Sequence, residues 1–163
     1  MSAADDPRGG RPDGGMASKP SNPKDALGIL KAPMSTVPMP VIAELGVAML
    51  EGALKYGRHN YRVIGVRASV YYDAVMMRHL PAWWEGEDDD PDSGISHVTK
   101  AIASLVVLRD AMINGNWVDD RPPPTPAGWL AKLNERVKTL IAKYPKPVEP
   151  YTAANAAKRA SAP

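Results

Sequence analysis

The segment with the clearest chemical potential lies between two histidines. Residues 78–97 read RHLPAWWEGEDDDPDSGISH, so that Glu85 and five further acidic side chains stand between His79 and His97. Carboxylate oxygens are the protein ligands that Mg²⁺ prefers, and waters and substrate phosphates fill its other positions. The segment therefore predicts Mg²⁺-assisted chemistry on a phosphate.

Three carboxylates of this segment are predicted to bind the metal. Glu87 and Asp90 have the spacing of one helical turn or a tight loop, and Asp92 stands where a helix is expected to begin. His79 and His97 could ligate the metal, orient the attacking water or shuttle its proton, because imidazole titrates near neutrality. The alternative is a solvated acidic loop in which Asp92 only caps the next helix.

Other polar residues could complete such a site. Glu51, or Glu44, would reach the metal if its helix packed across the acidic loop, although Glu51 and Lys55 could equally form an ordinary i,i+4 surface pair. Basic and amide side chains could bind the phosphate oxygens that the metal leaves free, or could belong to a mixed-charge surface. These side chains are Lys24, Lys31, Lys55, Arg58, Asn60, Arg62 and Arg78.

The aromatic residues allow two interpretations, and several other chemistries are excluded or disfavoured. Tyr56, Trp83 and Trp84 could stack on a purine base, or they could be core side chains. The chain has no Cys, which excludes thiolate ligands and disulfides. It also has no Walker-type phosphate loop and no serine in a strand–turn–helix context.

Hydrophobic spacing predicts the elements that position these residues. Apolar residues at helical spacing predict helices over residues 41–57, 69–84, 92–115 and 125–145. Ser69 is expected to cap the second helix and Pro81 to kink or end it, and Asp92 or Ser93 is expected to cap the third. No segment has the alternation that a sheet requires, so an all-α fold is predicted.

The predicted helices imply three regions of the chain. Residues 1–21 are rich in Gly, Pro, Asp, Arg and Ser and are expected to form a disordered leader. Residues 22–121 should form a helical domain, and residues 122–163 a proline-rich linker, an amphipathic helix and a flexible tail. The core is thin for a bundle of this size, so a homo-oligomer, at least a dimer, is expected to complete it.

Composition limits the cellular setting and the partners. The net charge of the 163-residue chain is only +2, which makes nucleic acid an unlikely partner, although a basic C-terminal helix could serve an accessory role. No apolar run approaches the length that crosses a bilayer, and no signal-peptide pattern begins the chain. A protein of the cytoplasm is expected.

Three segments resemble a known family. NPKDALGILKAPMSTVP, EGALKYGRHNYR and the 78–97 segment resemble the N-terminal domain family of phage dATP/dGTP diphosphohydrolases, which is grouped with MazG-like nucleotide pyrophosphohydrolases. The resemblance covers residues 22–121. It implies an all-α, Mg²⁺-dependent enzyme, in the host cytoplasm, that converts a purine deoxynucleoside triphosphate to the monophosphate and pyrophosphate.

The resemblance also implies which residues act. The matching positions are Lys31, Lys55, Tyr56, Asn60, Arg62, Arg78, His79, Glu87, Asp90, Asp92 and His97. MazG-like enzymes carry two glutamates one turn apart, whereas Glu44 and Glu51 are two turns apart here. Because fold and activity are separable, a non-catalytic nucleotide-binding protein or an oligomeric scaffold stands as the alternative.

Overall fold

The structure is a computed structural model that describes residues 22–160, so the predicted disordered leader lies outside the described residues. The described residues divide into two compact units, with the boundary after Asp120. Both units are mostly helical, which confirms that part of the predicted fold class. Among the described residues, no helix combines the length and the apolar character needed to span a membrane.

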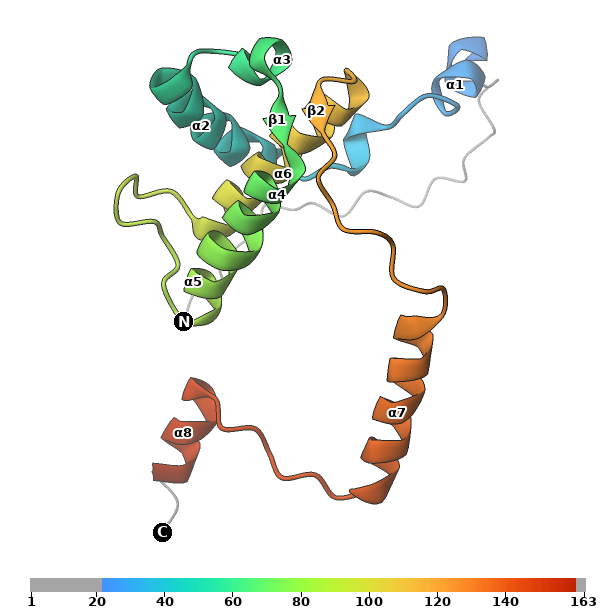
Figure 1. The fold of residues 1–163 in the computed structure, drawn as a ribbon, viewed down its shortest axis with the longest axis vertical. Helices are drawn as coiled ribbons and strands as arrows, with labels where there is room; N and C mark the ends of the chain where they lie inside the picture. Colours follow the sequence, from blue (N-terminus) through green and yellow to red (C-terminus); the bar gives the residue numbers. More distant parts are fainter. Residues whose placement is uncertain (1–21, 161–163) are drawn as a thin grey trace, which may run out of the picture. The chain divides into compact units, whose positions relative to one another are not determined.

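The first unit is built around one long helix. This helix, α6 (His97–Ile113), contacts α2 (Met39–Tyr56) and also the helical run of α4 (Ala68–Asp73), η2 (Ala74–His79) and α5 (Leu80–Trp84). In Figure 1, α2 and the α4–α5 run approach α6 from different directions. The predicted first helix thus corresponds to α2, which ends at Gly57 as expected.

The second predicted helix is one continuous helical run with an irregular middle. Its central part, η2, is a π-helix of six residues that ends at His79. Pro81 was predicted to kink or end this helix, and the helical run continues through it to Trp84. Single π-turns within α-helices are rare and often lie at functional sites. Here the π-turn places His79 at its C-terminal end.

The start of the third helix differs from the prediction. Neither Asp92 nor Ser93 caps α6, because the preceding residues fold into a tight turn and Ser96 takes the N-cap position. Asp90 organises this turn: its carboxylate accepts the backbone N–H groups of Asp92 and Ser93 at 2.8 and 3.3 Å. The backbone N–H of Asp90 in turn donates to the carbonyl of Ile95 at 3.0 Å.

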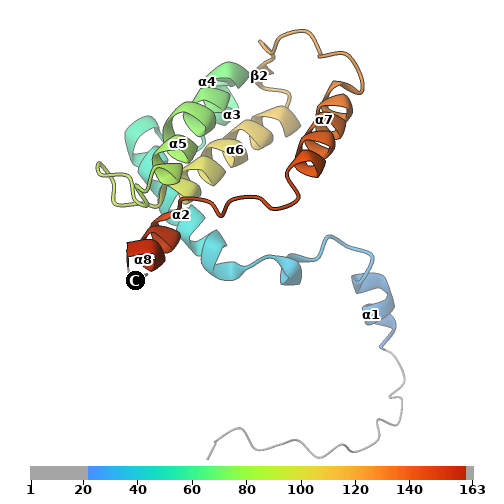
Figure 2. The ribbon, with the colours of Figure 1, turned by 90° about the horizontal axis from the view of Figure 1, so that it is seen from below.

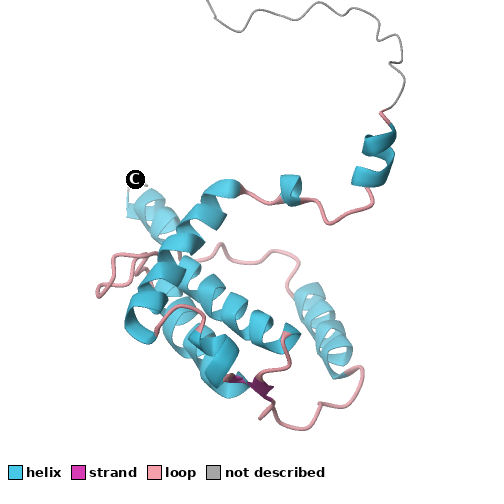
Figure 3. Ribbon diagram, turned by 90° about the horizontal axis from the view of Figure 1, so that it is seen from above, coloured by secondary structure: helices cyan, strands magenta, loops and turns pink. Residues whose placement is uncertain are grey.

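A small parallel sheet corrects the expectation of a purely helical chain. Strands β1 (Val66–Arg67) and β2 (Trp117–Val118) pair beyond the short helix α3 (Asn60–Ile64), and Figure 3 shows the pair in magenta. The predicted cap of the second helix was also wrong, because α4 begins at Ala68 and Ser69 lies inside it. The Ser69 N–H instead donates to Asp120, after β2, at 2.9 Å.

The buried core of the described residues is made of small side chains. No large side chain there is fully buried, and the buried apolar residues are Ala48, Val66, Ala68, Ala74, Val75, Ala101 and Ala111. Alanines let the helices approach closely but bury little apolar area each. The predicted homo-oligomer stays a prediction.

The remaining elements lie toward the two ends of the described chain. Helix α1 (Pro23–Gly28) and the short 3₁₀-helix η1 (Met34–Thr36) precede α2, outside the four predicted helices. The second unit holds α7 (Trp129–Lys143) and α8 (Ala153–Ala160), which Figure 2 shows in red tones. Helix α7 begins after Gly128, later than the start predicted at residue 125, and α8 had no predicted counterpart.

Candidate metal and nucleotide site

A groove of about 910 Å³ opens in the first unit, lined by side chains from α2, α3, the α4–η2 run and α6. Its volume lies within the range of small-molecule sites. Most of the predicted site residues line it: Glu51, Lys55, Tyr56, Asn60, Arg78, His79, Asp90, Asp92 and His97. The fold therefore gathers residues from distant parts of the sequence around one space.

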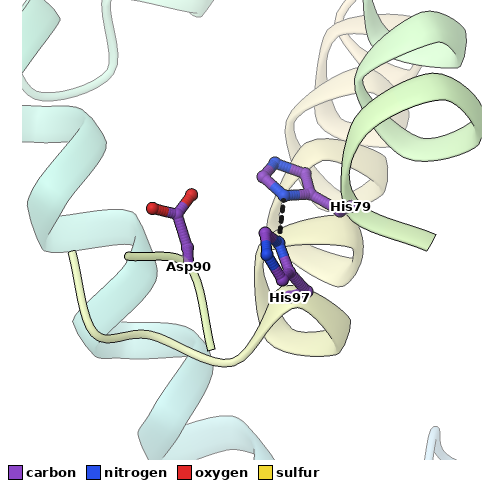
Figure 4. Close-up of side chains that lie close together, drawn as sticks. All are labelled: His79, Asp90 and His97. Carbon is purple, nitrogen blue, oxygen red and sulfur yellow. Dashed lines mark hydrogen bonds between the residues drawn. The ribbon is translucent and has the colours of Figure 1, made fainter. Parts of the chain in front are cut away.

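Two histidines and one aspartate meet on this groove. His79, Asp90 and His97 each offer a ligand atom, and these atoms lie within 4.8 Å of one another. Figure 4 shows His79 and His97 projecting from neighbouring helices, with the Asp90 carboxylate rising from the loop beside them. We call these three residues the His–Asp–His cluster.

The local folding of the chain fixes each member of the cluster. His97 opens α6 and is only 5% exposed, and its backbone N–H donates to the carbonyl of Asp88 at 2.9 Å. His79 ends the π-helix, and Asp90 lies in the turn that precedes α6. All three side chains are thus held by ordered backbone.

The hydrogen bonds of His97 define its orientation. Its Nε2 lies 2.9 Å from Glu87 Oε1, and its Nδ1 lies 3.0 Å from Nδ1 of His79. An ionised carboxylate only accepts hydrogen bonds, so the His97 ring proton belongs on Nε2 and its Nδ1 carries a lone pair. A carboxylate behind a metal-binding imidazole is the usual means by which proteins orient that imidazole.

The spacing of the two Nδ1 atoms suits a shared cation. Adjacent ligands of an octahedral ion, bound at about 2.1 Å, lie about 3.0 Å apart, which matches the separation between His79 and His97. Burial, followed by the neighbouring His97, lowers the pKa of His79 below its ordinary value. The lowered pKa favours the neutral ring, which can bind a metal through Nδ1 when its proton lies on Nε2.

The carboxylates that were predicted to bind the metal form hydrogen bonds or ion pairs with side chains of the protein itself. Asp90 Oδ2 accepts from Lys100 Nζ at 2.8 Å, and Asp92 Oδ2 accepts from Lys55 Nζ at 3.2 Å. Glu51 lies between the same two lysines, and its hydrogen bond with Lys55 is the main cause that lowers its pKa. Glu87 contacts His97 as described. The roles of Glu51, Glu87 and Asp92 as direct metal ligands stay predictions.

Some predicted residues lie away from the cluster. The guanidinium of Arg62 donates twice to Asp110 on α6, at 2.8 and 2.6 Å, and this pairing raises the pKa of Arg62 and lowers that of Asp110. Glu44 accepts from Thr99 at 2.6 Å. Lys31 is exposed in the segment between α1 and η1. The roles of Lys31 and Arg62 in phosphate binding stay predictions.

The alternative prediction, that the three aromatic residues are core side chains, does not hold for the isolated chain. Tyr56, Trp83 and Trp84 are all exposed, so they are not core side chains of the isolated chain. Several groove residues were not predicted from the sequence, among them Tyr71 and Lys100. Lys100 follows His97 by three residues and therefore shares its helix face, which is the signal that could have identified it.

The donor set of the cluster bears on which ion could bind. Two imidazoles and a carboxylate suit first-row divalent ions such as Mn²⁺, Co²⁺ or Zn²⁺, whereas Mg²⁺ prefers oxygen ligands throughout. The residues therefore fit a divalent cation, and they fit a nitrogen-accepting one better than the predicted Mg²⁺.

The fold and this site define a class of protein: a mostly helical domain with a groove and a His–Asp–His group that could hold a metal ion. The comparison with protein families makes the assignment specific. The chain belongs to the family described as dATP/dGTP diphosphohydrolase, N-terminal, whose model matches residues 21–121. No curated protein and no solved structure matches the chain.

Proposed function

We propose that the protein hydrolyses a purine deoxynucleoside triphosphate, dATP or dGTP, to the monophosphate and pyrophosphate with the help of a divalent cation. The observation that carries the proposal is the His–Asp–His cluster on the wall of a groove large enough for a nucleotide. Membership of the diphosphohydrolase N-terminal family supports the same activity. A phage origin follows from the resemblance alone and stays a prediction.

Residues in the groove and beside it have different roles in this proposal. His79, Asp90 and His97 would hold the cation, and Glu87 would keep the His97 ring oriented through their 2.9 Å contact. Bound there, the cation would supply Lewis-acid catalysis to phosphoryl transfer. The predicted ion is Mg²⁺, and the two imidazoles make Mn²⁺ the better test ion.

The nucleotide itself would be held by the basic and polar side chains of the groove. Lys55, Arg58 and Arg78 line the groove and would bind the triphosphate oxygens, because guanidinium and ammonium groups pair well with phosphate. Tyr56 and Asn60 also line it and could contact the base. Aromatic side chains stack on bases and amides pair with base edges, which suits both residues to this role.

Incubation of the full chain with each dNTP and Mn²⁺ or Mg²⁺ tests the proposal. Chromatography should detect the monophosphate and pyrophosphate from dATP or dGTP, with much less product from dCTP and dTTP. Stripping the protein with a chelator should remove the activity, and adding the cation back should restore it, because the cation supplies the Lewis acid. Release of inorganic phosphate without pyrophosphate would contradict the proposed bond cleavage.

The second candidate function is nucleotide binding without turnover. It is favoured by one observation, that each predicted carboxylate ligand already contacts a lysine or a histidine. The same experiment separates the two functions. Retained nucleotide binding with no hydrolysis under either cation would establish the binding protein and exclude the hydrolase.

We also propose that a second copy of the chain covers the exposed apolar side of α2. Val47, Leu50 and Leu54 fall on one face of this helix, and all three are at least half exposed, Leu54 at 78%. Contiguous exposed apolar patches often mark protein–protein interfaces, and a unit whose core is made of small side chains gains stability when a partner adds apolar contacts.

Light scattering after size exclusion should therefore give at least the mass of a dimer. The Leu54→Glu variant is expected to shift the mass toward the monomer, because burying a carboxylate in an apolar interface is costly. Since Leu54 is exposed in the chain itself, the variant should still fold. Val63→Glu on α3, also highly exposed, is the control. A monomeric native chain would contradict the proposal.

A further inference from the structure

Lys100 is the most enclosed ammonium group near the cluster. Its side chain is 14% exposed, and it lies on α6 one turn after His97. Its Nζ lies 2.8 Å from Asp90 Oδ2, 2.9 Å from Ser93 Oγ and 3.2 Å from Glu51 Oε2. Lysine is seldom enclosed to this degree unless its charge is paired.

The three donors of the ammonium match three acceptor groups. Two of the acceptors come from the turn before α6, and the third, Glu51, comes from α2, 49 residues away in the sequence. The carboxylates are themselves largely enclosed, with side chains 16% and 19% exposed for Asp90 and Glu51. The ammonium thus joins two elements through charges that solvent screens only in part.

Asp90 connects this arrangement to the His–Asp–His cluster. It belongs to the cluster, and it also accepts from Lys100. Two carboxylates and a hydroxyl around one positive group resemble the oxygen environment of a hard divalent cation. The distances of 2.8–3.2 Å are those of hydrogen bonds to an ammonium, and they exceed the 2.0–2.6 Å typical of Mg²⁺ or Ca²⁺ ligands.

We propose that Lys100 acts as a resident cation, which occupies the place next to the His–Asp–His cluster that a second divalent ion would otherwise take. Lys100 is then a positioning residue: its charge holds Asp90 in place and keeps Glu51 from serving as a metal ligand. The inference rests on the proposed function only for the first ion, the one at the cluster itself. It predicts that the native protein binds one divalent ion per chain.

Removal of the ammonium should create a second site. In Lys100→Ala, Glu51 and Asp90 keep their negative charges and lose the group that separates them, which leaves space and two carboxylates for an ion. Mn²⁺ bound per chain, measured by equilibrium dialysis with metal analysis, should rise from one to two. Lys100→Arg keeps the charge, and Lys100→Met fills the space without offering an additional oxygen ligand, so both should keep the native count.

Lys138→Ala is the matched control, because Lys138 also pairs with a carboxylate, Glu135, at 2.6 Å, and lies on α7 in the second unit. If Lys100→Ala is too unstable for dialysis without metal, its thermal unfolding midpoint is measured as Mn²⁺ is added. A rise larger than that of the native protein supports the proposal, because an ion that binds only the folded state stabilises it. No such rise overturns it.

The number of Mn²⁺ ions bound per chain separates this inference from the proposed function. One Mn²⁺ in both the native protein and folded Lys100→Ala overturns the role of Lys100 and leaves the first site intact. No Mn²⁺ in the native protein with one in Lys100→Ala supports the role of Lys100 and contradicts the cation site of the proposed function. Two ions in the native protein overturn the inference directly.

Discussion

Replacing His97 with alanine is expected to abolish divalent-cation binding and dNTP hydrolysis together. His97 supplies one of the two Nδ1 atoms that lie 3.0 Å apart, and it is nearly fully buried at the start of α6. Loss of an outer partner of a metal ligand costs about 10–100-fold in affinity or activity, so loss of a ligand itself should cost more than about 100-fold. Calorimetric Mn²⁺ titration and the chromatographic assay measure the two effects.

Two further variants make this result specific. His79→Ala should show the same joint loss, because the two imidazoles share one ion in the proposed site. His59→Asn is the control: His59 also lines the groove but does not belong to the cluster, and asparagine tolerates its left-handed backbone at φ 60°. Full Mn²⁺ affinity in a folded His97→Ala protein would exclude the cluster as the metal site.

Glu87→Ala is expected to weaken Mn²⁺ binding by about 10–100-fold, and to leave hydrolysis recoverable at saturating Mn²⁺. Glu87 contacts Nε2 of His97, the nitrogen that faces away from His79. It therefore orients the ring, and its loss frees the ring to rotate without removing a ligand. Glu87→Gln should give an intermediate affinity, since its amide oxygen still accepts the hydrogen bond but carries no charge.

The same variants distinguish this role from the one predicted from the sequence. If Glu87 were itself a metal ligand, the activity of Glu87→Ala would stay low at every Mn²⁺ concentration. Glu85→Ala, which removes a nearby exposed carboxylate, is the matched control and should bind Mn²⁺ as the native protein does. A weakened affinity in the Glu85 variant would mean that the overall charge of the loop, and not the contact with His97, sets the metal affinity.

The sequence predicts the long helices well because their signals are local. The apolar spacing along α2 and α6, with a glycine after each helix, depends only on neighbouring residues. The π-helix and the β1–β2 pair have no local signal of comparable strength. The π-turn lies in an otherwise regular helical pattern, and the strands are two residues long and pair across about 50 residues of sequence. Whether residues this far apart in the sequence pair with one another depends on how the helices between them pack.

The start of α6 also shows that local sequence signals do not determine the structure of a segment by themselves. Asp92 and Ser93 are good N-cap residues by type, yet Asp90 binds their backbone N–H groups and the helix begins only at His97. The position of His97 at the first turn, facing His79, follows from this turn. Propensity ranks possible caps, and the hydrogen bonds of the whole loop decide among them.

The chemical groups of the site can be identified from the sequence alone: two imidazoles on either side of an acidic segment, lysines and arginines before it, and no thiol. Tertiary structure decided how these groups are paired. It brought His79, Asp90 and His97 together, and it placed the Lys100 ammonium between Asp90 and Glu51. The physical reason is that a carboxylate is a metal ligand, an ion-pair partner or a ring-orienting acceptor according to the charge that lies within about 3 Å of it, and packing, not sequence spacing, sets that neighbour.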